Sequence, residues 1–292
     1  LHDRGQAPNN WNWNNMQSRN LLNLALALLV AGLALFAYLR PAPQDAAQLK
    51  VSSLAAAQVA RIVIQRPGQS ELALQKRAGL WFVAAPFNAR ADNLRVEKIL
   101  KILSAKSAQS FAATDLARFG LDQSPLRLAI DGQTFAFGTQ HPLSNEIYVA
   151  TQGRVYLLPP SHFASAAASA PDFASKMLFA PDENPVAFAF PGLTLTQDQG
   201  KWSRLPPGPD LSQDSLNQWA DEWRHAIAVI AQPYAQGKPA EALSVRLANG
   251  KTVPFQVLQR DPELVLLRGD ENMQYHFPGA IGSRLLLPPQ SH

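Results

Sequence analysis

The chain has 292 residues, of which 47% are hydrophobic and only 16% are charged, and its 26 lysines and arginines against 22 acidic residues give a net charge of +4. Soluble globular proteins carry about 25% charged residues, so this deficit predicts that part of the chain does not face water. The sequence contains no cysteine, which excludes disulfides, thiolate metal sites, a cysteine nucleophile and a lipoprotein anchor.

The apolar residues are concentrated in residues 21–39, which read LLNLALALLVAGLALFAYL and contain no charge. As a helix this segment would span about 28 Å, close to the hydrocarbon core of a bilayer. Arg19 and Arg40 flank it, and Tyr38 occupies the position of an interfacial aromatic residue. Because the apolar region of a signal peptide is usually about 7–15 residues long, we predict a retained transmembrane helix over residues 21–39.

The segments on either side of this helix carry further expectations. Residues 1–20 are expected to form a cytoplasmic tail, and residues 40–53 a linker to the folded part. Large C-terminal domains are translocated largely regardless of their charge, so we expect the bulk of the chain outside the cytoplasm. Trp11 and Trp13 are interpreted either as part of a disordered extension or, together with Tyr38, as anchors at the level of the lipid headgroups.

The first folded unit is predicted over residues 54–160. Runs of β-branched and alternating apolar residues indicate its strands, and the Asp-Gly pair at residues 131–132 is a strong hairpin signal. Asp92 is expected to cap a helix whose apolar stripe extends from Leu94 to Leu103. The predicted strands are residues 60–64, 72–74, 80–83, 126–130, 134–137, 147–149 and 155–158.

A second unit with the same order of elements is predicted over residues 186–290, after a helical linker over residues 161–185. An Asp-Ser pair at residues 214–215 is expected to cap its helix, whose apolar positions continue to Ile230. The predicted strands are residues 186–190, 193–195, 201–204, 243–247, 253–255, 264–267 and 275–277.

Three landmarks of the two units recur at a nearly constant spacing. They are Trp81 and Trp202 (121 residues apart), Gly132 and Gly250 (118), and Tyr156 and Tyr275 (119). Such a spacing indicates a tandem repeat. We describe each copy as a β-β-α-β-β-β-β unit and predict an α+β fold, with mostly antiparallel sheets that a helix covers on one face.

The titratable residues show no pattern typical of catalysis or of metal binding. The six histidines have no metal-ligand spacing, and no nucleophile elbow or phosphate-binding loop is present. Asp221 and His225 lie four residues apart on the predicted helix, where a shared proton or metal competes with the interpretation that we favour, an ordinary solvated pair. His162 lies in a proline-rich loop and is interpreted as a turn residue. We therefore predict no enzymatic activity, no cofactor and no metal.

Trp219 and Trp223 are the candidate residues for a partner surface. They lie four residues apart on the helix of the second unit, where the first unit has smaller side chains. Extra aromatic side chains on a helix either extend the core or mark an exposed interaction surface. We favour core packing and keep the partner surface as the alternative.

Three stretches give the sequence a family resemblance. They are residues 16–39 as a short stub and anchor, the run GLWFVAAP at residues 79–86 followed by Asp92, and the run FGLD at residues 119–122. Together they resemble the bacterial family known as domain of unknown function 4340. The resemblance implies a membrane-anchored protein outside the cytoplasm without known catalysis, and an accessory role beside ABC-type exporters.

The sequence as a whole therefore predicts a protein of the bacterial inner membrane whose bulk is periplasmic. The expected function is that of a noncatalytic accessory or assembly subunit of an envelope complex, with an ABC-type transporter as the candidate complex. The alternatives are a periplasmic ligand- or peptide-binding module and, more weakly, a hydrolase without a recognisable motif. The expected partners are membrane lipid, through residues 21–39, and other envelope proteins. Nucleic acid is not expected, because the lysines are spaced rather than clustered with aromatic residues.

Overall fold

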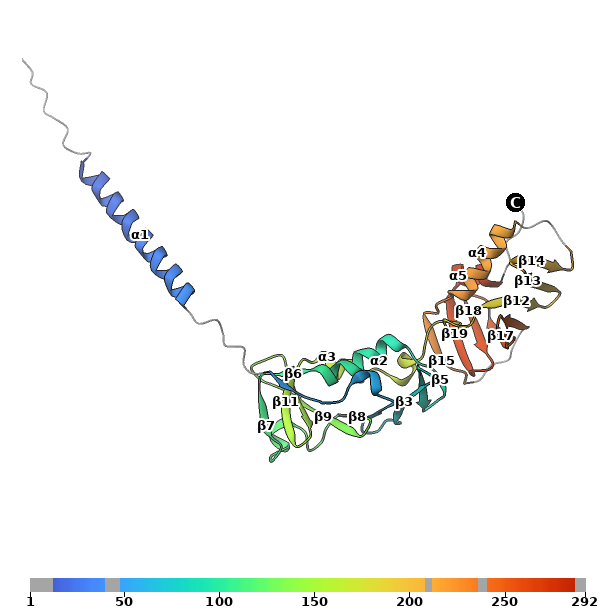
Figure 1. Cartoon of the computed structure of the whole chain (residues 1–292), viewed down its shortest axis with the longest axis horizontal. Coiled ribbons are helices and arrows are strands. Elements are labelled where there is room, and N and C mark those ends of the chain that lie inside the picture. The colour runs from blue at the N-terminus through green and yellow to red at the C-terminus, as the bar shows by residue number, and fades with distance from the viewer. Residues whose placement is uncertain (1–12, 40–47, 208–211, 236–240, 287–292) are drawn as a thin grey trace, which may run out of the picture. The chain divides into compact units, whose positions relative to one another are not determined.

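The computed structural model of the chain describes residues 13–39, 48–207, 212–235 and 241–286. The chain divides into two compact units, Leu1–Gln48 and Leu49–His292. The first contains helix α1 (Trp13–Leu39), on which residues 21–36 are all exposed (Figure 1).

No helix among the described residues combines the length and the apolarity needed to cross a membrane. Most of the predicted tail and linker lies outside the described residues. The same holds for Trp11 and for the side chains of Trp13 and Tyr38, the predicted interfacial anchors.

The compact unit Leu49–His292 begins with a nine-stranded sheet in which every neighbouring pair is antiparallel. Its strand order is β5-β4-β3-β2-β8-β9-β10-β11-β7. The strands are β2 (Arg61–Gln65), β3 (Leu72–Arg77), β4 (Leu80–Ala85), β5 (Ala89–Arg90), β7 (Ser110–Ala112), β8 (Leu126–Ile130), β9 (Gln133–Gln140), β10 (Ile147–Thr151) and β11 (Arg154–Leu158). A separate short ladder pairs β1 (Leu49–Lys50) with β6 (Lys106–Ser107).

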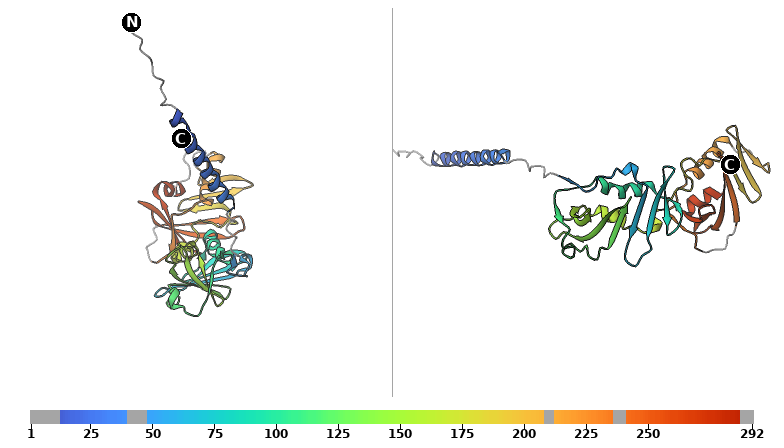
Figure 2. Two further views of the ribbon diagram at one scale, coloured as in Figure 1. Left: turned by 90° about the vertical axis from the view of Figure 1, so that its left-hand side faces the viewer. Right: turned by 60° about the horizontal axis from the view of Figure 1, so that its bottom comes forward.

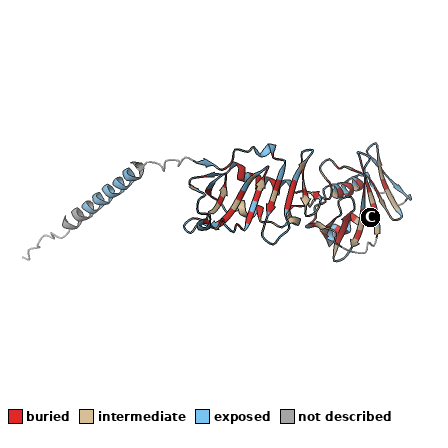
Figure 3. Ribbon diagram, turned by 90° about the horizontal axis from the view of Figure 1, so that it is seen from below, coloured by how far each residue is buried: buried red, intermediate tan, exposed pale blue. Residues whose placement is uncertain are grey.

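Alternation of side chains gives this sheet its buried face. In β2, Ile62 and Ile64 are fully buried whereas Arg61 and Gln65 are exposed, as the period of two residues requires. Figure 3 shows such buried positions along the strands. Helices α2 (Asn93–Leu100) and α3 (Ser161–Ala166) contact each other and lie on the same face of the sheet (Figure 1).

Asp92 caps α2 as predicted. Its carboxylate accepts hydrogen bonds from the backbone amides of Leu94 (2.9 Å) and Arg95 (3.3 Å), which no residue of the helix itself could satisfy. The apolar stripe then directs Val96 and Ile99, both buried, onto the sheet.

An eight-stranded antiparallel sheet follows, with the order β14-β13-β12-β16-β17-β18-β19-β15. Its strands are β12 (Pro185–Phe190), β13 (Leu193–Asp198), β14 (Lys201–Leu205), β15 (Ile230–Pro233), β16 (Glu241–Leu247), β17 (Thr252–Gln259), β18 (Glu263–Arg268) and β19 (Met273–Pro278). Helix α4 (Gln213–Arg224) contacts β12 and β14, and α5 (Gly279–Leu286) contacts β18 and β19 (Figure 2). The fold is therefore α+β with antiparallel sheets, as predicted.

The order of elements within each unit differs from the prediction in two ways. Four strands of the first sheet (β2 to β5) and three of the second (β12 to β14) precede the main helix, where the β-β-α-β-β-β-β formula has two and the predicted ranges have three, and an edge strand follows the helix: β7 in the first sheet and β15 in the second. The two sheets nevertheless share one topology, because their orders match strand for strand apart from β5. The edge strands give little sequence signal, since β7 has only three residues and β15 ends in a proline.

The helix of the second unit also differs from its prediction. It is capped by Ser212 instead of the Asp-Ser pair at 214–215, and it ends at Arg224. Ile230, predicted as its last apolar position, begins strand β15 and pairs with His276 of β19. A β-branched residue is better suited to an extended strand than to a helix. Pairing with β19 therefore places Ile230 in a strand.

The predicted helical linker over 161–185 is helical only in its first half. After α3 and a short 3-10 turn (Ala170–Phe173), the linker passes between the two sheets and forms isolated β-bridges from Ala174 to Ala91 and from Met177 to Ile227. The amide of Ser175 donates to the carbonyl of Arg90 at the edge of the first sheet (2.8 Å). The amide of Ala228 donates to the carbonyl of Lys176 (2.8 Å). This segment therefore joins the sheets through main-chain hydrogen bonds.

Candidate functional site

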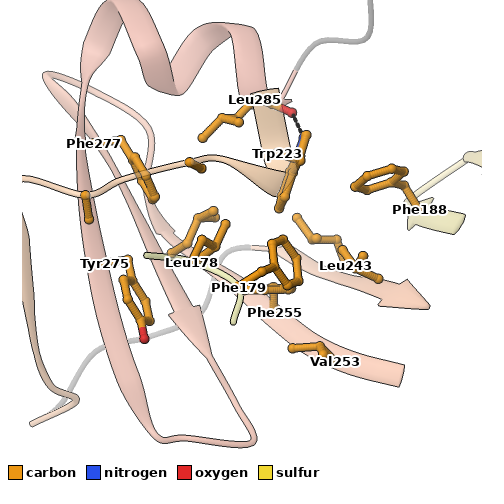
Figure 4. Packing of buried hydrophobic residues seen from close by; sticks show 14 of the residues in the cluster. Leu178, Phe179, Phe188, Trp223, Leu243, Val253, Phe255, Tyr275, Phe277 and Leu285 are labelled. Carbon is orange, nitrogen blue, oxygen red and sulfur yellow. Dashed lines mark hydrogen bonds between the residues drawn. The ribbon is translucent and has the colours of Figure 1, made fainter. Parts of the chain in front are cut away.

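The structure buries the two residues predicted as an alternative partner surface. Trp219 is 4% exposed and Trp223 is 0% exposed, and both indole nitrogens donate to backbone carbonyls of α5. The Trp223 bond to Leu285 measures 2.7 Å (Figure 4). Both side chains therefore pack in the core, the interpretation favoured from the sequence, and neither is exposed for contact with a partner.

Aromatic packing explains why α4 carries these large side chains. Phe188 lies on β12. The centroid of its ring is 4.6 Å from that of Trp219 and 5.4 Å from that of Trp223. The two indoles thus fill the space between helix and sheet. The pair was visible in the sequence, but the carbonyls of α5 that accept its hydrogen bonds come from about 60 residues further along the chain.

The histidines singled out in the sequence form no catalytic arrangement with each other. The Nδ1 atom of His225 lies 3.0 Å from the backbone carbonyl oxygen of Asp221. The contact is therefore with the main chain of Asp221 and not with its carboxylate. Burial lowers the pKa of His162 below its usual value. Across the described residues, no three histidine, aspartate or glutamate side chains gather closely enough to hold a metal ion.

Two buried arginines organise the largest group of charged side chains. Arg268, at the end of β18, has a side chain only 1% exposed. Its guanidinium donates to both carboxylate oxygens of Glu183 (2.6 and 2.8 Å), to Asp270 (2.9 Å from Nε) and to the carbonyl of Leu178 (2.6 Å). This fork geometry matches the planar donors of arginine to planar carboxylates.

The second arginine connects the two sheets. Arg90 lies on β5 of the first sheet, and its guanidinium forms an ion pair with Glu271, which follows β18 of the second sheet. It also donates to the carbonyls of Met177 (2.9 Å) and Leu178 (3.1 Å) and to the hydroxyl of Tyr275 (3.2 Å). Every contact of this group therefore ties the first sheet to the linker or to the second sheet.

The group as a whole is neutral and fully paired. Its cations are Arg90, Arg268 and Lys251, and its anions are Glu183, Asp270 and Glu271. Burial by itself would raise the pKa of Asp270, but hydrogen bonds from Arg268 and Lys251 outweigh burial and lower this pKa to about 2. A carboxylate held so firmly ionised is a poor general acid or base near neutral pH. The arrangement therefore serves to hold the two sheets together, and we call this group of six charged residues the joint.

Acid should weaken this joint, which gives a first testable prediction. A carboxylate with a depressed folded-state pKa stabilises the fold above its unfolded pKa of 3.8, and the stabilisation is lost as pH falls toward the folded value of about 2. We expect the free energy of unfolding to fall by on the order of 2 kcal/mol between about pH 5 and pH 2 from Asp270 alone. Denaturant unfolding across this range measures the slope. An Asp270→Asn variant with an unchanged slope would contradict the assignment.

A pocket of about 770 Å³ lies beside α2 in the first sheet. Buried apolar side chains form part of its lining, among them Trp81, Leu100 and Leu103. Its charged lining residues are Lys50, Lys76, Lys101, Lys106 and Glu97. We call this the lysine-lined pocket. Its dimensions are those of a small-molecule site, since such pockets typically measure about 300–1,000 Å³.

Four separate elements bring these lysines together. Lys50 ends β1, Lys76 lies on β3, Lys101 begins the 3-10 turn after α2, and Lys106 begins β6. Lys76 is half-buried, with its ammonium 6.0 Å from the centroid of the Trp81 ring. Within the described part of the chain, no ion pair joins any of the four ammonium groups to a carboxylate.

A smaller pocket of about 410 Å³ lies at the start of α2, next to the junction of the sheets. Its lining is mostly apolar and includes Leu94, Met177, Phe179 and Ile227, together with Trp81, which also lines the larger pocket. Leu94 and Ile227 are 69% and 60% exposed. Its charged lining residues, Arg90, Asp92 and Lys176, are of both signs, so it lacks the run of like charges found in the larger pocket.

Sequence reasoning does not find the lysine-lined pocket. Three lysines on or after the first helix, Lys98, Lys101 and Lys106, indicate only a solvated face. Lys50 and Lys76 are brought to this face by the β1–β6 ladder and by the β3 strand, which are long-range pairings. No local pattern in the sequence indicates that these lysines line one pocket.

The comparisons with known proteins bear on the folded part. The model of the family described as a domain of unknown function (DUF4340) matches residues 81–224. No curated protein and no solved structure matches the chain. The matched range begins in β4 and ends in α4, so it includes parts of both sheets and the junction between them. Over residues 81–224, the chain belongs to the DUF4340 family.

Proposed function

We propose that the chain is a noncatalytic, membrane-anchored accessory subunit of a bacterial envelope complex and that it acts by binding. The lysine-lined pocket is the observation that carries this proposal. Its lining has four lysines against one glutamate, and among the described residues none of these lysines forms an ion pair with a carboxylate, whereas the cations at the junction are all paired. An excess of positive charge in the lining of a partly apolar pocket supports binding of an acidic group.

In this proposal, residues 21–39 hold the protein in the inner membrane and the folded part lies in the periplasm. The support is the uncharged, leucine-rich sequence of this segment, flanked by Arg19 and Arg40. An ABC-type transporter is the candidate complex, on the strength of the family resemblance.

We also propose that the two sheets arose by duplication of one unit. Their shared strand order supports this, as do the caps of the main helices, Asp92 and Ser212, which are 120 residues apart. Pro86 follows β4 and Pro206 follows β14, also 120 residues apart. A duplicated body offers two versions of one surface that can diverge in what they bind.

A periplasmic ligand-binding module is the second candidate function. The specific observation in its favour is the volume of the lysine-lined pocket, which suits a small anionic molecule as well as an acidic group on a protein. Among the described residues, no cluster that could hold a catalytic metal ion supports the third alternative, a hydrolase.

Copurification tests the accessory role. The full chain, extracted with several mild detergents, is expected to retain a stoichiometric membrane-protein partner at low salt and to lose it as ionic strength rises, because exposed charges are screened. Charge reversal by Lys101→Glu should weaken retention at least fivefold. Lys98→Glu serves as the matched control, because Lys98 lies on α2 but does not line the pocket. Recovery as a lone monomer in every detergent would contradict the accessory role.

A further inference from the structure

We infer that the lysine-lined pocket binds the phosphate headgroup of an anionic phospholipid. This inference deepens the proposed function and rests on it for attachment to a membrane. It starts from the short β1–β6 ladder, in which Lys50 and Lys106 are direct cross-strand partners. Like charges placed directly opposite each other destabilise a ladder. This ladder has only two residue pairs, and besides them the amide of Val51 donates to the carbonyl of Ala105 (3.2 Å), so the like charges face each other in a short element.

An anion between these two lysines would remove the repulsion. No carboxylate of the described chain does so, although Glu97 lines the same pocket. Lys76 and Lys101 add two further positive charges to the lining. The pocket therefore has an excess of three positive charges, and a phosphate diester with neighbouring polar groups complements it.

The second sheet provides an internal comparison. Counted from the helix caps Asp92 and Ser212, the position of Lys101 is occupied by Asp221, and that of Leu103 by Trp223. The fold therefore does not itself require the pocket, because the same place in the second sheet holds a large indole and an acidic residue. The basic and small residues that line the pocket beside α2 are therefore not repeated at these positions beside α4.

The same comparison extends to the strand next to β4. Strands β3 and β13 begin at Leu72 and Leu193, so Lys76 corresponds to Gln197. The basic character of this lining residue is thus also absent from the second sheet. The two sheets therefore differ at these positions both in side-chain volume and in charge. This is the difference expected if only the first sheet binds a ligand.

The apolar part of the lining distinguishes among anionic ligands. The exposed residues Ala55, Ala56 and Ala57 and the partly exposed Leu54 present hydrocarbon beside the lysines of the lining. An anionic amphiphile matches both surfaces, whereas free phosphate would leave the apolar lining wet. Trp81 is only 6% exposed, so it cannot offer the open ring face on which the bases of single-stranded nucleic acid stack.

The sequence position of the pocket favours a lipid over a soluble anion. Lys50 follows Leu39, the last residue of the proposed membrane segment, by eleven residues, which can extend to at most about 40 Å. Headgroups of the same bilayer are therefore within reach at a high effective concentration. A lysine close to an anionic membrane surface strengthens binding roughly fivefold, so several lysines together give a substantial effect.

Titration of the full chain in zwitterionic detergent tests the inference. The probes are dihexanoyl-phosphatidylglycerol and dihexanoyl-phosphatidylcholine, and binding is followed by calorimetry. We expect the phosphatidylglycerol to bind at least tenfold more tightly than the phosphatidylcholine. Lys101→Glu and Lys106→Glu should each weaken its binding at least fivefold, and Lys98→Glu less than twofold. Thermal unfolding of each variant without lipid verifies that it is folded.

Four outcomes would overturn the lipid assignment. They are equal binding of the two lipids, an equal effect of Lys98→Glu and Lys101→Glu, competition by inorganic phosphate at the same concentration as phosphatidylglycerol, and tighter binding of a decaglutamate peptide than of the lipid. The third outcome assigns the pocket to a soluble phosphate, and the fourth to an acidic protein. If lipid binding fails while copurification of a partner still depends on Lys101, the accessory role stands and only the lipid inference falls.

Discussion

The variant Arg268→Met is expected to lose about 3–5 kcal/mol of stability, because it leaves the carboxylates of Glu183 and Asp270 buried without their main counter-charge. Burial would lower the pKa of Arg268, but these carboxylates raise it above its usual value, so the guanidinium is charged at every accessible pH. Urea unfolding of the full chain in mild detergent, followed by tryptophan fluorescence, measures the loss.

Two further variants separate this explanation from a general loss of packing. Lys251→Met removes an ammonium that is 49% exposed, and it should cost no more than about 1 kcal/mol. The double variant Arg268→Met/Glu183→Gln should lose less than the sum of its single changes, because the glutamine no longer carries the unpaired charge. Strict additivity of the two changes would show that the carboxylate is not the cause.

The variant Trp223→Ala is expected to lose about 3–5 kcal/mol, the usual cost of emptying a buried indole site. The ring is fully buried among Phe188, Phe255 and Leu243, and its Nε1 donates to Leu285 of α5 (Figure 4). Losing it opens a cavity between α4 and the sheet and leaves that carbonyl without its partner. The same unfolding measurement applies.

Leu94→Ala is the control for Trp223→Ala. This leucine is 69% exposed on α2, so its truncation should change stability by no more than about 0.5 kcal/mol. A Trp223→Ala variant of unchanged stability that fails to retain a partner would reverse the assignment, since that is the behaviour of an exposed contact residue.

Local signals in the sequence were sufficient for much of the fold. Asp92 caps α2 because a side-chain oxygen satisfies backbone amides within three residues, which requires no distant partner. The alternating isoleucines of β2 and the turn at Asp131 and Gly132 are equally local. The 120-residue spacing extends the same logic, since it repeats each local signal once.

The family assignment also came from short stretches. The run at residues 79–86 overlaps the range that the family model matches, which begins at Trp81. Trp81 reads as a sheet residue near the end of a strand, and β4 confirms this. The position of Trp81 on β4 does not, however, reveal that its side chain lines two pockets.

Edge strands escaped prediction because their pairing supplies what their sequence lacks. β7 is defined by bonds to β11, and β15 by bonds to β19. Ile230 fits the apolar spacing of a helix and of a strand equally well. Pairing with His276 selects the strand, since hydrogen bonds to a neighbouring strand stabilise an extended segment that is too short to hold that conformation alone.

By itself, the sequence determined the antiparallel α+β class, the capped helix of the first unit and the family. Only the tertiary structure decided where the charges and the large rings lie. Arg90 and Glu271 are 181 residues apart and share one ion pair, and Lys50 and Lys106 face each other across a two-residue ladder. The reason is physical: caps, turns and alternation act between near neighbours, whereas burial and charge pairing depend on which distant segments the sheets bring together.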